Sequence, residues 1–218
     1  MAWIYPVVAV VLFLAPMATE LTVTEPLTNI AVLIEQTHIP NLVSAVILHT
    51  RLFDTLGEVV VFALASIGVR SLLATETAKT NIRMLNDPPS VVLCQMGATI
   101  AALIGVELAL RGHLSPGGGF AAGVSGGTAI GLLLISGASE LSNRLYLHYR
   151  ADAWEKGAVV VFLSGAFLAL EEITLPDGIF GSLQSGGWIP CLNLIVALKV
   201  TLGSWAIIHW FVRYRGLL

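Results

Sequence analysis

Charged side chains are scarce in this 218-residue chain, and their scarcity excludes an ordinary soluble domain. Only 11% of the residues are charged, whereas 56% are hydrophobic, and the mean hydropathy is +0.85. Soluble globular domains carry about 25% charged residues. The composition therefore indicates an integral membrane protein with little sequence left for a soluble domain. We expect lipid, and no nucleic acid, to surround such a chain.

Cysteine is equally scarce, since Cys94 and Cys191 are the two cysteines of the chain. They are far apart, each lies within an apolar run, and neither belongs to a CxxC pair, so ligation of zinc or an iron–sulfur cluster by this chain alone is disfavoured. No dinucleotide or haem motif occurs either. We expect no cofactor, no tightly bound metal and no enzymatic activity.

Long apolar runs, in contrast, are abundant. A run of roughly 17 to 25 apolar residues is long enough to span a membrane as a helix. The sequence predicts an all-α integral membrane protein with about six transmembrane helices, at residues 3–19, 55–74, 91–110, 119–137, 156–173 and 189–211. The first run lacks a positive n-region and is predicted to be an uncleaved helix. Between residues 27 and 50, two short apolar pieces flank Pro40, which predicts an interfacial helix.

The basic residues favour one side of the membrane. They fall in two connections and at the C-terminus, as Arg70, Lys79 and Arg83, then Arg144, Arg150 and Lys156, then Arg213 and Arg215. The opposite connections carry mainly acidic residues, namely Glu20, Glu25, Glu35, Asp54 and Asp177. By the positive-inside rule, the basic connections are cytoplasmic. We expect a multi-pass protein of the cell inner (plasma) membrane with both termini in the cytoplasm.

A glycine-rich stretch separates two of the apolar runs. Pro116 followed by Gly117, Gly118 and Gly119 predicts a tight turn. Gly119, Gly123 and Gly127 then form a doubled GxxxG spacing, which brings another helix close. The stretch GHLSPGGGFAAG at residues 112–123 resembles the B subunit of the Mrp-type Na+/H+ antiporters. There, the motif joins the first two helices of a small four-helix membrane protein.

A second resemblance lies nearer the N-terminus. NLVSAVIL at residues 41–48 and RLFDTLGE at residues 51–58 resemble the C-terminal end of the large Mrp A subunit and the equivalent small subunit of membrane-bound hydrogenases. Polar residues between 75 and 89 break the apolar pattern. We expect an A-subunit-like region at residues 1–85, with two helices and the interfacial segment, and a B-like four-helix domain at residues 86–218.

Asp54 and Glu58 are the first candidates for an ion path. They are four residues apart, hence on one helical face, where two carboxylates can share a proton or hold a hydrated cation. Alternatively, Asp54 caps the helix and Glu58 occupies its first turn. The family resemblance favours Glu58 in the path and Asp54 as the cap.

Glu107 and His113 are further candidates. Glu107 is placed for an i,i+4 ion pair with Arg111. Alternatively, Glu107 and His113 form a titratable relay that opens at the outer surface, because histidine changes charge near neutral pH. Glu171 and Glu172 end the fifth helix, where they are either solvated or collect cations at a pathway mouth.

Lys199 is the most unusual residue, because it lies near the middle of the last apolar run and cannot reach either membrane surface. It requires a partner or a water-filled cavity. Candidate ion-pair partners within the chain are Glu107, Glu171 and Glu172. Alternatively, a neighbouring subunit provides the partner. Lysines in such positions carry protons in complex I-type antiporter subunits. The B-subunit pattern implies an acidic residue in this region, whereas this chain has Asn193 and Lys199.

A serine protease is a remote alternative. The segment around Ser125 reads GVSGG on the fourth predicted helix, and His209 lies on the sixth, which resembles the rhomboid intramembrane proteases. A catalytic dyad requires the two side chains within hydrogen-bond reach. The loop charges instead place them near opposite ends of their helices, most of a bilayer apart.

The sequence therefore predicts a membrane subunit of a multisubunit Na+/H+ antiporter that contributes to the ion path and to assembly. The resemblance implies large proton-channel subunits and several small membrane subunits as partners, with Na+ and H+ as the ions. A redox-driven complex, either a membrane-bound hydrogenase or a complex I-like assembly, is an alternative host. A purely structural scaffold is a third possibility.

Overall fold

The computed structural model describes residues 30–78, 82, 84–171 and 173–215. Throughout these residues the regular secondary structure is helical, as predicted. The apolar run at residues 3–19, predicted to be the first transmembrane helix, lies outside the described residues, as do Glu20, Glu25, Lys79, Arg83 and Glu172.

Five helices of the described residues are long and apolar enough to cross a membrane, or six if a bent pair near residue 40 counts as one span. This confirms the predicted all-α membrane fold. Each lies over one of the predicted runs. The five are α4 (Leu52–Leu73), α5 (Pro88–Arg111), α6 (Gly119–Leu133) continued by η2 (Leu134–Ala138) and α7 (Ser139–His148), α8 (Ala151–Leu170) and α9 (Trp188–Arg215).

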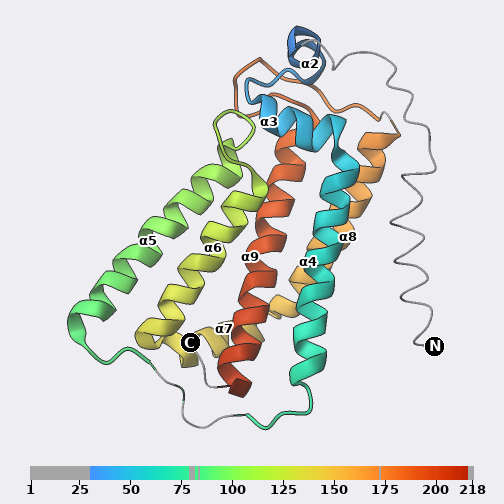
Figure 1. Ribbon diagram of the computed structural model, residues 1–218. Coiled ribbons are helices and arrows are strands. Elements are labelled where there is room, and N and C mark those ends of the chain that lie inside the picture. Colours follow the sequence, from blue (N-terminus) through green and yellow to red (C-terminus); the bar gives the residue numbers. More distant parts are fainter. Residues whose placement is uncertain (1–29, 79–81, 83, 172, 216–218) are drawn as a thin grey trace, which may run out of the picture.

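The bent pair consists of α2 (Ile30–Thr37) and α3 (Leu42–Ala45) extended by η1 (Val46–Thr50), with a bend of 77°. Pro40 lies at the break, and the Asn41 side chain caps α3 by accepting from the amides of Val43 and Ser44. The two short helices lie across one end of the bundle (Figure 1), the position expected of an interfacial segment.

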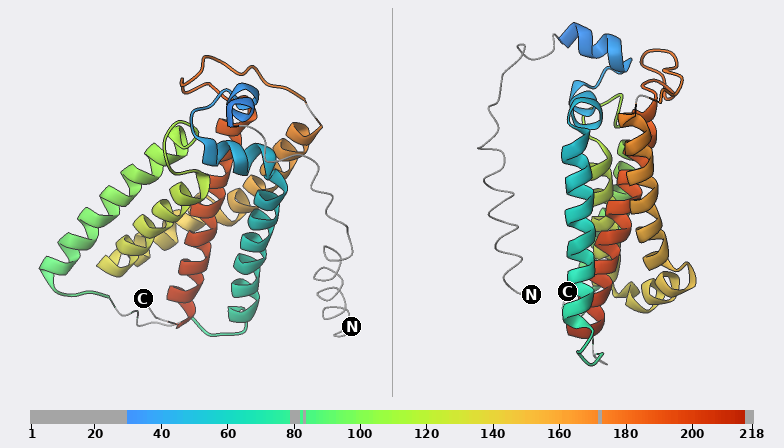
Figure 2. Two further views of the ribbon diagram at one scale, coloured as in Figure 1. Left: turned by 45° about the horizontal axis from the view of Figure 1, so that its top comes forward. Right: turned by 90° about the vertical axis from the view of Figure 1, so that its right-hand side faces the viewer.

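The central helix of the bundle is α9. It packs against α6, α8 and α4, and it lies between α5 and α6 on one side and α4 and α8 on the other (Figures 1 and 2). Of its most apolar 18-residue window 44% is buried, compared with 11% for the outlying α5. Its side chains Leu192, Val196 and Val200 form the core with Val59 of α4 and Phe162 of α8.

The glycine-rich stretch makes a turn and a close helix contact. Gly117 and Gly118 have φ angles of 147° and 141°, values that side chains other than glycine rarely adopt. On α6, an added Cβ at Gly119, Gly123 or Gly127 would collide with α9. The glycines therefore allow the backbones of α6 and α9 to approach closely.

Asn41 ties this turn to the N-terminal part of the chain. Its side-chain amide donates to the carbonyls of Gly112 and Ser115, at 2.6 and 2.7 Å. Ser44 donates to the Gly112 carbonyl as well, at 2.7 Å. Since α4 also packs on α9, the two regions predicted from sequence pack together in one bundle.

Candidate ion site in the helix bundle

Lys199 lies in the middle of α9 and is fully buried, with 0% of its surface exposed. Its Nζ has no hydrogen-bond partner among the described residues. The Nζ atom lies 4.1 Å from the centre of the Phe62 ring of α4, which is a cation–π contact. An ammonium group so far from water requires a compensating charge nearby.

The opposite charge is that of Glu155 of α8, which is 3% exposed and lies with the Phe62 ring at Gly203. It makes no direct hydrogen bond with the ammonium. The Ser66 side chain of α4, also buried, lines the same pocket as Glu155. Gly203 of α9 provides the space, because a Cβ there would lie 3.3 Å from Glu155 Oε1 and 3.1 Å from Phe62 Cδ1. Three helices thus enclose a buried acid, a buried base and an aromatic ring.

Two of the partners predicted for Lys199, Glu107 and Glu171, lie on exposed surface instead, and Glu172 lies outside the described residues. Glu107 accepts from Arg111 at 3.0 Å and is exposed, and Glu171 is exposed at the end of α8. Glu155 was missed because the apolar run was drawn from residue 156, which left Glu155 among the charges of the preceding connection. A signal did exist, since Glu155, Ala158 and Phe162 have the three- and four-residue spacing of one buried face.

A pocket of about 380 Å³ leads to Glu155 from the end of the bundle away from α2 and α3. We call it the Glu155 pocket; its lining includes Ser66, Arg70, Asp152, Glu155, Lys156 and Trp210. Asp152 accepts from Arg70 at 3.0 Å and from Lys156 at 2.7 Å. Asp152 is thus neutralised by two cations, whereas Glu155 lies at Gly203 beside the ring that Lys199 contacts.

A second pocket, of about 670 Å³, opens toward the α2–α3 end between α4, α6 and α9. We call it the Glu58 pocket; its lining includes Thr55, Glu58, Phe62, Gly118, Phe120 and Asn193. The Phe62 ring that contacts Lys199 therefore also lines this pocket. Asn193, which stands where the antiporter pattern implies an acid, donates to the carbonyls of Leu108 and Ala109.

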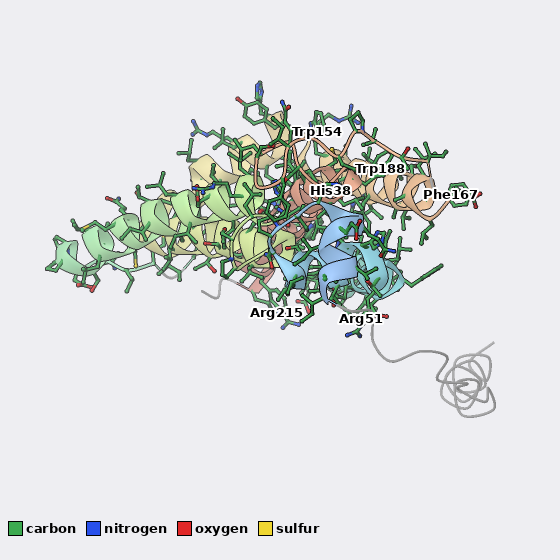
Figure 3. The ribbon with its side chains drawn as sticks, turned by 90° about the horizontal axis from the view of Figure 1, so that it is seen from above. His38, Arg51, Trp154, Phe167, Trp188 and Arg215 are labelled. Atoms are coloured by element: carbon green, nitrogen blue, oxygen red, sulfur yellow. The ribbon has the colours of Figure 1, made fainter. Side chains whose placement is uncertain are left out.

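Asp54 and Glu58 have different surroundings. Asp54 is exposed and bonded to Arg51, which lies at the periphery of the molecule when the bundle is viewed from the α2–α3 end (Figure 3). Arg51 occupies the N-cap position of α4 and makes no side-chain cap, so the predicted capping role of Asp54 was wrong. Glu58 lies beyond the first turn of α4, not within it, on an exposed face that lines the pocket.

His113 is fully buried beside the glycine turn. Its Nε2 lies 3.4 Å from the carbonyl oxygen of Ser182. Burial lowers the pKa of the imidazole below its usual value. The Glu107 carboxylate is ion-paired with Arg111, whereas the His113 imidazole lies near the Ser182 carbonyl. The two side chains predicted to form a relay are therefore held by separate contacts.

The surroundings of Ser125 and His209 do not form a catalytic dyad. The Ser125 hydroxyl donates to the Ala101 carbonyl at 2.7 Å, and the His209 ring stacks on Tyr146 with centroids 4.3 Å apart. The register of α6 against α9 separates the two residues by roughly 10 Å along the axis. This is less than the separation expected from the loop charges, but it is beyond hydrogen-bond reach.

Fold and site together define a polytopic helical membrane protein that buries an acid–base pair at its centre. Residues 89–206, more than half of the chain, match the family model described as a domain related to the MnhB subunit of Na+/H+ antiporter. The chain therefore belongs to this family, which is one of transporters rather than enzymes, and it is a membrane subunit of the antiporter type.

Two solved structures share the fold. One is a chain of the membrane-bound sulfane sulfur reductase, an archaeal respiratory membrane complex, with 22% identity, a TM-score of 0.70 and 97% of each chain covered. The other is a chain of the Mrp complex from Dietzia sp. DQ12-45-1b, with 21% identity and a TM-score of 0.59. The match covers 96% of this chain but 25% of the Dietzia chain. No curated protein matches.

Proposed function

We propose that the chain contributes an ion-carrying step, formed by Glu155 and Lys199, to a multisubunit Na+/H+ antiporter. The family supports the kind of transport, and the burial of Lys199 beside Glu155 carries the proposal. A charged group in the membrane interior costs several kcal/mol. Such a pair is kept where it serves a path, because apolar side chains of similar volume would stabilise the bundle at least as well.

The pair can exist in two states that differ in the position of one proton. As ammonium and carboxylate, the two groups attract each other, and Lys199 is held over the Phe62 ring. As amine and carboxylic acid, they lose most of this attraction. A proton that enters or leaves therefore changes the forces between α4, α8 and α9, which provides a physical link to movement of Na+ in neighbouring subunits.

Neighbouring subunits have ample surface to contact. Side chains such as Trp154 and Phe167 point outward from α8 (Figure 3) and are 64% and 61% exposed. Both structural neighbours are chains of multisubunit membrane complexes. We infer large proton-channel subunits and small membrane subunits as partners, in the inner (plasma) membrane. The end of the bundle with Arg70 and Arg215 faces the cytoplasm by the positive-inside rule.

The test is transport by the purified complex in proteoliposomes. Lys199→Met and Glu155→Gln should assemble normally and lose Na+-driven proton movement. Glu76→Gln is the matched control, because Glu76 forms an exposed ion pair with Arg215 at 3.0 Å, and it should transport normally. Normal transport by Lys199→Met would refute the proposal, whereas failed assembly of both variants would favour the scaffold alternative.

A redox-driven complex is the second candidate host. The observation that favours it is the match to the sulfane sulfur reductase chain, which covers nearly all of both chains. The ion-carrying step proposed for Glu155 and Lys199 is the same in either host. What differs is the energy source, which lies in other subunits.

A further inference from the structure

The Glu155 pocket and the Glu58 pocket approach Lys199 from opposite ends of the bundle. The first is lined by α4, α8 and α9 and contains Arg70 and Trp210 near the end away from α2 and α3. The second is lined by η1, α4, α6 and α9 and contains the glycine turn. Phe62, which lines the Glu58 pocket, contacts the Lys199 ammonium, and Glu155 lines the other pocket, so Lys199 lies next to residues of both.

The separation between the pockets is short and is filled by Phe62. On α4, Phe62 lines the Glu58 pocket, whereas Ser66, one helical turn further on, lines the Glu155 pocket. One turn corresponds to roughly 5 Å along the axis. The Phe62 ring lies under the Lys199 ammonium and against Gly203. The Phe62 ring thus stands between the Glu58 pocket and Ser66 of the Glu155 pocket, in contact with Lys199.

We propose that the ion crossing this chain is the proton, that Phe62 is the barrier between two aqueous half-paths, and that Lys199 carries the proton past it. The inference rests on the proposed function and specifies its ion. Na+ then crosses the complex in another subunit.

The chemistry of the barrier excludes Na+. A hard cation requires several oxygen ligands to replace its water, whereas the barrier presents an aromatic ring and an ammonium group. The positive charge of Lys199 also repels a second cation. A proton meets neither obstacle, because it passes as part of an N–H or O–H bond.

The transfer balances without any further reactant. Lys199 releases a proton to water in the Glu58 pocket; the N–H bond breaks, and the electron pair stays on nitrogen. Water in the Glu155 pocket then protonates the Glu155 carboxylate. The carboxylic acid passes a proton through water to the neutral amine, which restores the ammonium and the carboxylate. One proton has moved between the pockets, and each step is reversible.

The first test measures leaks through the complex in proteoliposomes. Phe62→Ala should raise passive proton permeability several-fold and leave sodium permeability unchanged. Val61→Ala is the control, because Val61 lines the same pocket but is 66% exposed. Its proton permeability should equal that of the parent complex. A sodium leak in Phe62→Ala, or no proton leak at all, would overturn the inference.

The second test needs no transport. In a Cys94→Ala, Cys191→Ala background of the whole complex, Ser66→Cys should react with a small membrane-impermeant thiol reagent only from the Arg70 side. Glu58→Cys should react only from the opposite side. Labelling of both from one side, or no labelling of Ser66→Cys from either, would contradict two opposed aqueous pockets.

The inference and the proposed function fail separately. If Lys199→Met transports normally, the proposed function is wrong and the inference falls with it. If Lys199→Met is inactive while Phe62→Ala shows no increase in proton permeability, the proposed ion-carrying pair is supported and the barrier role of Phe62 is wrong.

Discussion

Glycine at position 203 is as important to the site as the charged pair, because it sets the space that Phe62 and Glu155 share. The ring and the carboxylate both lie where a Cβ on Gly203 would point. Side-chain volume in a packed helix contact cannot change without moving its neighbours. The positions of an acid, a base and a ring therefore depend on a residue with no side chain.

Gly203→Ala should reduce transport and lower the stability of the bundle by about 1–3 kcal/mol, the usual cost of overpacking. The added methyl group displaces the Phe62 ring, because Glu155 closes the other side. Thermal unfolding of the purified complex, with transport in proteoliposomes, measures both effects. Gly157→Ala on α8 is the control, since nothing lies within 4 Å of its Cβ position. Equal behaviour of the two variants would contradict the packing role.

His113 should make the stability of the protein dependent on pH. Burial lowers its pKa in the folded chain below the usual 6.5, so below that pH the unfolded chain binds more protons. Stability is then fully present above pH 6.5 and is lost as the pH falls toward the folded pKa. Thermal midpoints of the complex between about pH 7 and about pH 5 should fall less steeply in His113→Asn.

His148→Asn is the control for this measurement, because His148 is exposed at the end of α7. It should keep the pH dependence of the parent complex. An unchanged slope in His113→Asn would show that other groups determine the acid sensitivity.

At the scale of helices, α6 and α9 form the contact on which the bundle depends. Gly123 faces Val200 and the Ala197 carbonyl, so the two backbones lie closer than side chains allow. The same contact places α9 beside the glycine turn, which Asn41 holds from the N-terminal side. The position of Lys199 in the bundle follows from this register.

Gly123→Ala should lower the yield and the thermal midpoint of the assembled complex. Its methyl group would collide with Val200 and lie 2.9 Å from the Ala197 carbonyl, a contact that backbone cannot relieve cheaply. Gly131→Ala, further along the same face, meets only Ile208 Cδ1 at an ordinary 3.6 Å and should be tolerated. The prediction is wrong if both variants assemble equally well.

At the scale of the whole molecule, the described helices expose large apolar faces. The most apolar window of α5 is 11% buried and that of α4 is 22% buried. Apolar faces of this size are covered by lipid or by other membrane helices. Together with the family match, these faces fit a chain that is one membrane subunit of an antiporter complex.

Purification with native partners should recover large proton-channel subunits and small membrane subunits, identified by mass spectrometry. Their presence without redox proteins would place the chain in a stand-alone antiporter. Co-purified reductase, hydrogenase or dehydrogenase subunits would place it in a redox-driven complex. A chain that purifies alone under mild detergent would contradict both hosts.

Sequence alone determined the class of protein, the places of the long described helices and the role of the glycines, because hydrophobic length and glycine spacing are local properties of the chain. It also singled out Lys199, since a lysine in an apolar run is conspicuous by itself. Only the tertiary structure placed Glu155 with Phe62 at Gly203, next to the ring that Lys199 contacts, while Glu107 and Glu171 are exposed. Those contacts join α4, α8 and α9, and the relative rotation and register of packed helices depend on all their side chains together.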